Sequence, residues 1–152
     1  MKFSKSEDVE MDQDALFAKV SNFSMFERLI IRRGVSLERV AGTPENAVGM
    51  AWDSKFQFRG KKRSARIEIM EYDAPNLLKF HAKSQNIEVR FEIDLTALSA
   101  KRTRMAVTSV LDPKSLSARL FVQSMKLGRS KLNKRYSQRV RQFASELESS
   151  QA

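Results

Sequence analysis

Five stretches of the chain alternate apolar and polar residues, and this alternation restricts the possible folds more than any other feature. They cover residues 47–58, 63–71, 77–83, 87–95 and 103–111, with short connections between them. A period of two is typical of β-strands that turn one face to the core and the other to water. With the strand-like segments at 2–10 and 33–40, the sequence predicts a seven-stranded antiparallel sheet with one apolar face.

The positions of the apolar residues agree from strand to strand. In an antiparallel pair the indices of facing residues add to a constant, and facing side chains share a face. Phe58 opposite Arg63 would leave a four-residue tip at 59–62, and Ala82 opposite Val89 would leave a two-residue turn at 85–86. The last pair of strands needs an even sum, which an odd-length loop around 97–101 allows. All three hairpins therefore fit one curved meander.

Helical spacing appears between the first two strands. Asp12 or Asp14 can cap a first short helix, and Ser21 or Asn22 can cap a second one over 23–32, because these side chains accept hydrogen bonds from the first turn. The second helix is rich in aromatic residues although it is short.

Helical spacing returns near the end of the chain. From about Lys114 to Leu147, apolar residues recur every three to four positions, with Gly128 as the single glycine. This predicts one long amphipathic helix that begins after Asp112-Pro113 and can bend at Gly128.

The length of 152 residues predicts one domain, which we place at 1–148, followed by a frayed tail at 149–152. The chain contains no cysteine, so neither a disulfide framework nor a thiolate zinc site can form. No apolar run is long enough to cross a bilayer, and the first residues have no apolar signal-peptide region. We expect a soluble cytoplasmic protein without metal or cofactor.

The order of elements resembles the START-like (SRPBCC, polyketide cyclase/dehydrase and lipid transport) superfamily. The resemblance rests on "DALFAKVSNFSMFERLI", on "EYDAPNLLKFHAKSQNIEVRFEIDLTAL" and on the final helix after "TSVLDPKSL". It implies an α+β helix-grip fold, in which a curved seven-stranded antiparallel sheet wraps around a long C-terminal helix. Two short helices after the first strand would close one end of the groove. Where members often have an aspartate and then a proline–tryptophan pair, this chain has Asn22 and then Phe26-Glu27.

The resemblance also implies a pocket for an apolar small molecule or a lipid. Some members are cyclases or dehydratases, and others are chaperone or oligomerisation modules, but no shared catalytic motif can be carried over. Pockets and cores are lined by the same residue types, so each inward residue is either core or pocket wall. The candidate pocket residues are Phe17, Phe23, Phe26, Met50, Trp52, Ser54, Phe56, Ile67, Ile69, Phe80, Phe91, Met105, Ser109, Phe121 and Met125.

Catalytic chemistry has little support in the sequence. His81 is the only histidine, and its position in the alternation places it on the outer face, so no Cys/His or Ser-His arrangement is expected on the inner face. Glu71 is the one acidic residue with inward parity that could act as an acid or base. We therefore assign no catalytic residue.

The net charge of +10 is concentrated in two clusters. A solvated surface is the default interpretation, an anionic membrane surface comes next, and nucleic acid is disfavoured because the aromatic residues are predicted to be buried. The sequence does not indicate an oligomeric state. The clusters comprise Arg59, Lys61, Lys62 and Arg63 between two strands, and Lys131, Lys134, Arg135, Arg139 and Arg141 on the final helix.

The sequence therefore favours non-catalytic binding of an apolar small molecule or lipid between the sheet and the C-terminal helix. One alternative is a cyclase- or hydratase-like enzyme that uses the same pocket. The other is an interaction module whose basic helix contacts an anionic membrane or an acidic partner.

Overall fold

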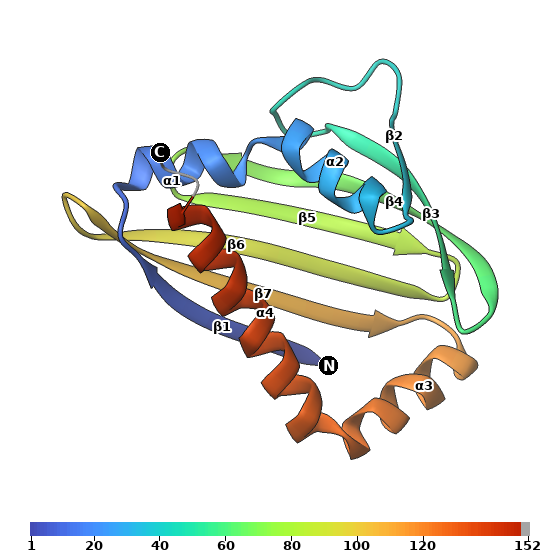
Figure 1. Ribbon diagram of the computed structural model, residues 1–152. Helices are drawn as coiled ribbons and strands as arrows, with labels where there is room; N and C mark the ends of the chain where they lie inside the picture. Colours follow the sequence, from blue (N-terminus) through green and yellow to red (C-terminus); the bar gives the residue numbers. More distant parts are fainter. Residues whose placement is uncertain (150–152) are drawn as a thin grey trace.

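The computed structural model describes residues 1–149, and Figure 1 shows the arrangement of its helices and strands. The elements in chain order are β1 (Lys2–Val9), α1 (Gln13–Val20), α2 (Phe23–Arg32), β2 (Ser36–Arg39), β3 (Ala51–Phe58), β4 (Lys61–Asp73), β5 (Leu77–Ser84), β6 (Ile87–Ser99), β7 (Arg102–Pro113), α3 (Leu116–Leu127) and α4 (Arg129–Ser149).

The seven strands form one antiparallel sheet in the order β1-β7-β6-β5-β4-β3-β2. Helix α4 crosses one face of the sheet, and α1 and α2 follow one another along the edge of that face (Figure 1). The end of α4 is fixed beside α1, where the Lys19 ammonium donates to the Leu147 carbonyl over 3.1 Å. This is the predicted α+β helix-grip fold with two short helices after the first strand.

The two short helices begin where the sequence predicts. Asp12 caps α1 by accepting from the Ala15 N–H, and Asn22 caps α2 by accepting from the Met25 N–H. The predicted strands at 33–40 and 47–58 are shorter than expected, because only Ser36–Arg39 and Ala51–Phe58 pair with neighbours. Val48, expected on the inner face, lies in the preceding loop and is 55% exposed.

Two of the three hairpin registers are confirmed. Ala82 faces Val89, and Leu95 faces Met105, which gives the expected even sum. The expected odd-length loop around 97–101 is wrong, because the tip is a two-residue turn at 100–101 and the register shifts between Ala97 and Ser99. The β3–β4 register is wrong by two residues, because Phe58 faces Lys61 and the tip is the two-residue turn Arg59-Gly60. Both tip residues have positive φ, 54° and 75°, as a type I′ turn requires. The inward faces of β3 and β4 are unchanged because a shift by two preserves parity.

The expected inward position of Glu71 is also wrong. The register of β4 against β5 shifts between Ile69 and Glu71, so Met70 is the extra residue of a bulge. The bulge reverses the alternation, and Glu71 lies opposite Lys79 with its carboxylate 4.0 Å from the ammonium. His81 is on the same outer face, as predicted, and contacts Glu88 over 3.2 Å.

The predicted single C-terminal helix is in fact two helices that meet at Gly128. Helix α3 lies beyond the end of β7, whereas α4 turns back across the sheet (Figure 1). The start was also misplaced: β7 continues to Pro113, and Ser115 rather than Asp112 caps α3 by accepting from the Ala118 N–H. Of the predicted tail at 149–152, Ser149 is the last residue of α4, and 150–152 lie outside the described residues.

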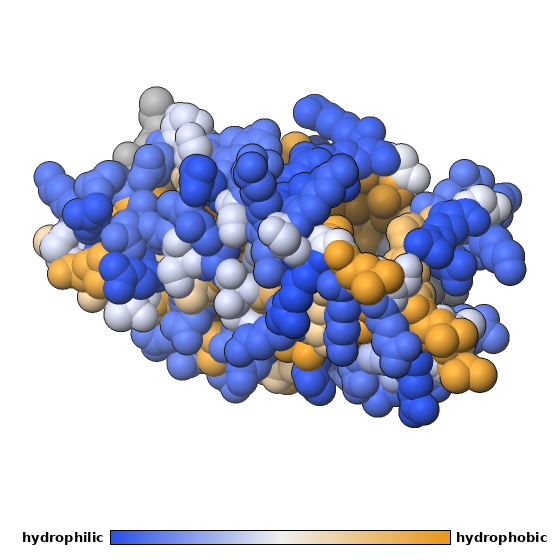
Figure 2. Space-filling model, turned by 90° about the horizontal axis from the view of Figure 1, so that it is seen from below, coloured by the Kyte–Doolittle hydropathy of each residue, from blue (hydrophilic) through white to orange (hydrophobic). Residues whose placement is uncertain are grey.

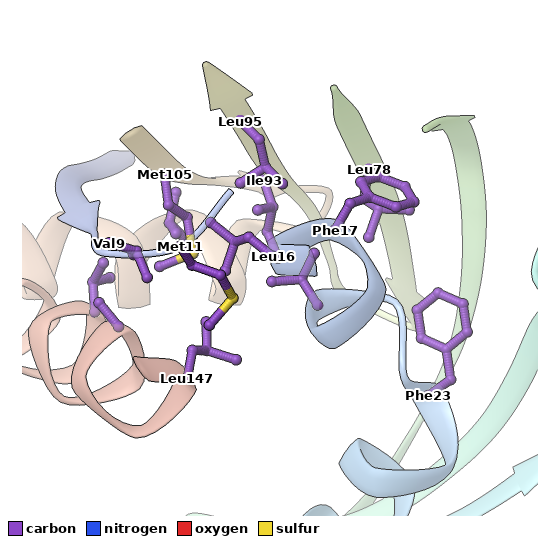
Figure 3. Packing of buried hydrophobic residues seen from close by; sticks show 14 of the residues in the cluster. Val9, Met11, Leu16, Phe17, Phe23, Leu78, Ile93, Leu95, Met105 and Leu147 are labelled. Atoms are coloured by element: carbon purple, nitrogen blue, oxygen red, sulfur yellow. The ribbon is translucent and has the colours of Figure 1, made fainter. Parts of the chain in front are cut away.

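The filled part of the core lies where α1, the end of α4 and the middle of the sheet meet. Figure 3 shows Met11, Leu16 and Leu147 directed toward one another beside Met105 and Ile93. Leu16 and Met105 are completely buried, and Met11 and Leu147 are 1% and 2% exposed. This end of the molecule is therefore packed solid, which leaves the opposite end, under α2, as the place for a cavity.

A candidate apolar ligand pocket

A cavity of about 450 Å³ lies between α2, the inner face of strands β3–β6 and the side chain of Phe143 on α4. This volume is within the range of small-molecule sites, roughly 300–1,000 Å³. Figure 2 shows hydrophobic side chains in the depth of a hollow on one face of the molecule. The cavity is lined by Val20, Phe23, Phe26, Glu27, Ile30, Leu37, Trp52, Ile67, Phe80, Ala82, Val89, Phe91, Ile93 and Phe143.

The floor of the cavity is one row of facing residues across the sheet. Trp52 faces Ile67, Ile67 faces Ala82, and Ala82 faces Val89, so four strands contribute one inward side chain each. Since facing residues of an antiparallel pair share a face, this row follows directly from the alternation in the sequence. Ala82 is the smallest member, and space is left above it.

Helix α2 forms the roof. Phe23, Glu27 and Ile30 are spaced by four and three residues, so they project from one side of the helix. Phe23 packs edge-on against Trp52 with ring centroids 5.5 Å apart. At the other side of the cavity Phe26 contacts Phe143 of α4, with centroids 5.7 Å apart. The aromatic residues thus link α2 to both the sheet and α4.

Glu27 is the one ionisable residue among the lining residues of this cavity. Its carboxylate accepts two hydrogen bonds from Arg39, at 2.7 and 2.8 Å, and one from the Trp52 indole N–H at 3.0 Å. The Arg39 hydrogen bonds hold the pKa of Glu27 below its usual value, despite an opposing effect of burial, and Trp52 lowers it further. Glu27 is therefore an ionised group that fixes the Trp52 ring and ties α2 to β2.

Six of the predicted pocket residues line the cavity: Phe23, Phe26, Trp52, Ile67, Phe80 and Phe91. The other nine lie elsewhere. Phe17, Met50, Ile69 and Met105 belong to the packed core, and Ser54 is buried on β3 opposite Leu37. The strand residues among them, Ser54, Ile69 and Met105, have inward parity, but parity does not distinguish the two ends of the groove.

The remaining predicted pocket residues have other neighbours. The Ser109 hydroxyl is 3.0 Å from the Tyr136 hydroxyl, and burial raises the pKa of Tyr136. Phe56 lines a second, polar hollow of about 820 Å³ beside Lys62 and Arg63. Phe121 and Met125 are half-buried on α3 and contribute nothing to the cavity wall, and Phe121 packs against Phe58 instead.

Sequence reasoning missed several lining residues, although the sequence contains a signal for some of them. Ala82, Val89 and Ile93 have the same inward parity as Phe80 and Phe91. Glu27 and Ile30 share a helix side with Phe23 and could have been found from the helical period. The helical period and the strand alternation could not identify Val20, Leu37 and Phe143, because these residues come from elements whose relative placement the sequence does not give.

The basic residues all lie outside this cavity. Arg59, Lys61 and Lys62 are exposed at the β3–β4 tip, with Arg63 half-buried beside them. Lys131, Lys134, Arg135, Arg139 and Arg141 are exposed on α4, and Arg141 contacts Glu7 of β1 over 3.5 Å. Within residues 1–149 no group of three His, Asp or Glu is placed to hold a metal, and no helix is long and apolar enough to cross a membrane.

No family model matches the chain, and no curated protein sequence matches it. Solved structures do. A conserved protein from Geobacillus kaustophilus is 19% identical with a TM-score of 0.65, over 99% of this chain and 97% of that one. The Zhui aromatase/cyclase from Streptomyces sp. R1128 is 10% identical with a TM-score of 0.64, over 97% and 93%.

A norcoclaurine synthase from Thalictrum flavum, a point mutant in complex with a transition-state analogue, is 12% identical with a TM-score of 0.63, over 82% of each chain. At these identities the similarities show the fold. The predicted resemblance is confirmed at that level: the chain has the helix-grip fold of the START-like superfamily.

Proposed function

We propose that this protein binds an apolar small molecule or a lipid in the cavity under α2, without catalysing a reaction. The observation that carries the proposal is the cavity itself, about 450 Å³ lined by apolar side chains from eight elements. Apolar surface in contact with water is unfavourable, and an apolar ligand that displaces this water is stabilised by roughly 25 cal/mol per Å² buried.

The exposure of the lining residues supports an open site rather than a filled core. Ile67, Ala82, Val89 and Phe91 point to the same side of the sheet as the buried core residues, yet they are only half-buried. In a filled core such central inward positions would be in contact on all sides. Here no side chains cover these four residues on the side of the cavity, so a ligand can make the contacts that core residues would make.

Glu27 limits the chemistry of the ligand. Its Oε2 accepts from both Arg39 and Trp52, whereas Oε1 accepts only one of the Arg39 hydrogen bonds. A carboxylate oxygen can accept two hydrogen bonds, so Oε1 keeps capacity for one donor. The ligand that fits is therefore largely apolar and carries at most one hydroxyl or amine near α2.

The same carboxylate argues against acid–base catalysis. A general acid or base is most effective with a pKa near the working pH. The pKa of Glu27 is shifted the other way, below 4.5, by its hydrogen bonds with Arg39 and Trp52. Glu27 is thus a weak base, and its role in the proposal is to orient a ligand and hold Trp52.

Trp52 provides the test, because it is the only tryptophan and lines the cavity. We expect the uncharged dye N-phenyl-1-naphthylamine to accept excitation energy from Trp52 and to bind at one saturable site. Ala82→Phe should abolish saturable transfer, since the new ring occupies the space above the floor. Ala97→Phe, an exposed position outside the cavity, is the matched control and should bind like the wild type.

Native mass spectrometry after incubation with a lipid extract would then identify the natural class of ligand. We expect a stoichiometric adduct on the wild type and on Ala97→Phe, and none on Ala82→Phe. Equal dye binding and equal adducts on all three proteins would refute the proposed site.

A further inference from the structure

The side of the molecule that carries α3 has a second feature, which is independent of the cavity. We propose that α3 and the β3–β4 tip together form a docking surface for an anionic lipid bilayer. This docking surface comprises the exposed leucines of α3, the basic residues beside them and the tip residues Arg59, Lys61 and Lys62. A failure of ligand binding in the cavity would leave this proposal untouched.

Three leucines of α3 face solvent. Leu116 is 72% exposed, Leu120 58% and Leu127 91%. Leu120 is four residues after Leu116, and Leu127 is about three full helical turns after Leu116, so all three lie on one side of the helix. The opposite side holds the buried residues Ala118 and Val122.

Helix α3 is thus apolar on two opposite sides, and the protein covers only one of them. Hydrophobic side chains are visible at the surface on the side from which Figure 2 is viewed. Leucines scattered singly on a surface are ordinary, but a row of three on one short helix marks an interaction site.

Basic residues predominate around these leucines, although Lys114 is paired with Asp112 at 2.8 Å and with Glu88 at 3.9 Å. The sequence contains no acidic residue between Asp112 and Glu146, whereas Lys114, Arg119 and Lys126 lie on or next to α3, and the basic residues of α4 follow. All three are exposed. An apolar row flanked by cations is the pattern of helices that lie in the interface of an anionic bilayer, with leucines among the acyl chains and cations among the headgroups.

The structure places the basic residues of the β3–β4 tip next to α3. Phe58, next to the β3–β4 tip, packs edge-on against Phe121 of α3 with ring centroids 5.6 Å apart. The Arg59 guanidinium lies 4.3 Å from the centroid of the same Phe121 ring. The basic residues of the β3–β4 tip therefore lie beside α3, although they are far from it in the sequence, and they extend the charge of Arg119 and Lys126.

A bilayer fits this docking surface better than the other anionic partners. Nucleic acid bases stack on aromatic side chains, but the exposed apolar residues of α3 are aliphatic leucines. A second copy of the chain in a two-fold dimer would place the same cations opposite one another, which is unfavourable. A bilayer accepts leucines and cations at the same time.

Co-sedimentation with vesicles tests the proposal. We expect the protein to bind vesicles of 70% phosphatidylcholine and 30% phosphatidylglycerol at 50 mM NaCl, and to be released at 500 mM. Neutralising Lys126→Gln with Arg119→Gln should weaken partitioning roughly 25-fold, at roughly fivefold per cation. The triple variant Leu116→Ser, Leu120→Ser, Leu127→Ser should lose binding at 50 mM NaCl, where the wild type binds.

The control is Leu98→Ser with Lys101→Gln, at the β6–β7 end of the sheet far from α3 (Figure 1). Leu98 is 42% exposed and Lys101 is exposed, so the control removes the same side-chain types elsewhere. It should bind like the wild type, and circular dichroism should show that every variant is folded. Absence of binding at 50 mM NaCl, or equal binding by the triple variant, overturns the proposal. The proposal is also overturned if the wild type and the triple variant both bind an oligonucleotide in a salt-sensitive way while neither of them binds vesicles.

Discussion

Replacing Ala82 by leucine separates an open cavity from a filled core by the sign of the change in stability. Leucine adds three carbons above the floor of the cavity, between Ile67 and Val89. At about 0.8 kcal/mol per buried methylene the gain is at most about 2.4 kcal/mol. Ala82 is only half-buried, so we expect about half of this, about 1.2 kcal/mol of added stability.

For a protein of this size a gain of this magnitude raises the melting temperature by about 2–5 °C. The matched control is Ala144→Leu, because Ala144 is 5% exposed in the packed core. There, the same three carbons should overfill the structure and cost about 1–3 kcal/mol. Urea and thermal unfolding measure both variants. If Ala82→Leu is destabilised as much as Ala144→Leu, the space above Ala82 is not a cavity and the reasoning fails.

Three further outcomes follow from named contacts. Glu27→Gln should cost about 1–2 kcal/mol at pH 7, because the carboxylate accepts charge-assisted hydrogen bonds from Arg39 and Trp52, and the exposed Glu38→Gln on β2 should cost much less. The pKa of Glu27 is lowered from 4.5 in the folded protein, so this stabilisation is present above pH 4.5 and is lost as the pH falls through the lowered pKa. The melting temperatures of the wild type and of Glu27→Gln should therefore converge in acid. Gly60→Ala should destabilise the protein by about 1 kcal/mol, because Gly60 has φ +75° in the β3–β4 tip. Gly128→Ala should be neutral or stabilising, because Gly128 has φ −105° and an added Cβ would have its nearest contact at 3.9 Å. The opposite order of stability in urea unfolding would contradict the assigned turn. Phe121→Ala should speed amide hydrogen exchange across α3 and leave α4 unchanged, since Phe121 holds α3 against Phe58 and Arg59; unchanged exchange in α3 would mean that these contacts do not fix it.

The alternation in the sequence was sufficient to predict the sheet, because one buried face requires the inward side chains of every strand to alternate in the same way. It gave the facing pair Ala82 and Val89, and it placed His81 on the outer face. It could not give the β3–β4 tip, because a shift of two residues preserves parity. It also misplaced Glu71, since nothing in the alternation signals that Met70 is the extra residue of a bulge.

The C-terminal region shows a similar limit. The apolar spacing continues through Gly128, so the sequence pattern alone predicts one helix where the structure has two. Leu116 and Leu120 belong to the apolar spacing that predicts this helix, but α3 buries Ala118 and Val122 and leaves both leucines exposed. A helix that is apolar on two sides leaves its orientation undetermined until its neighbours are known.

The candidate site was predicted in part for a different reason. Ile67 and Ile69 have the same residue type and the same inward parity, but Ile67 lines the cavity and Ile69 is completely buried in the core. The difference comes from what lies above each residue, α2 or the α1–α4 contact, and this depends on the tertiary arrangement of helices.

Methyl NMR of the protein during titration with N-phenyl-1-naphthylamine tests the central claim most directly. The account predicts saturable shifts at the methyl groups of Ile30, Ile67 and Val89, which line the cavity, and little change at Leu16, Ile69 and Leu78, which are completely buried in the core. Shifts that spare Ile30, Ile67 and Val89, or that spread equally through the core, would contradict a ligand site under α2.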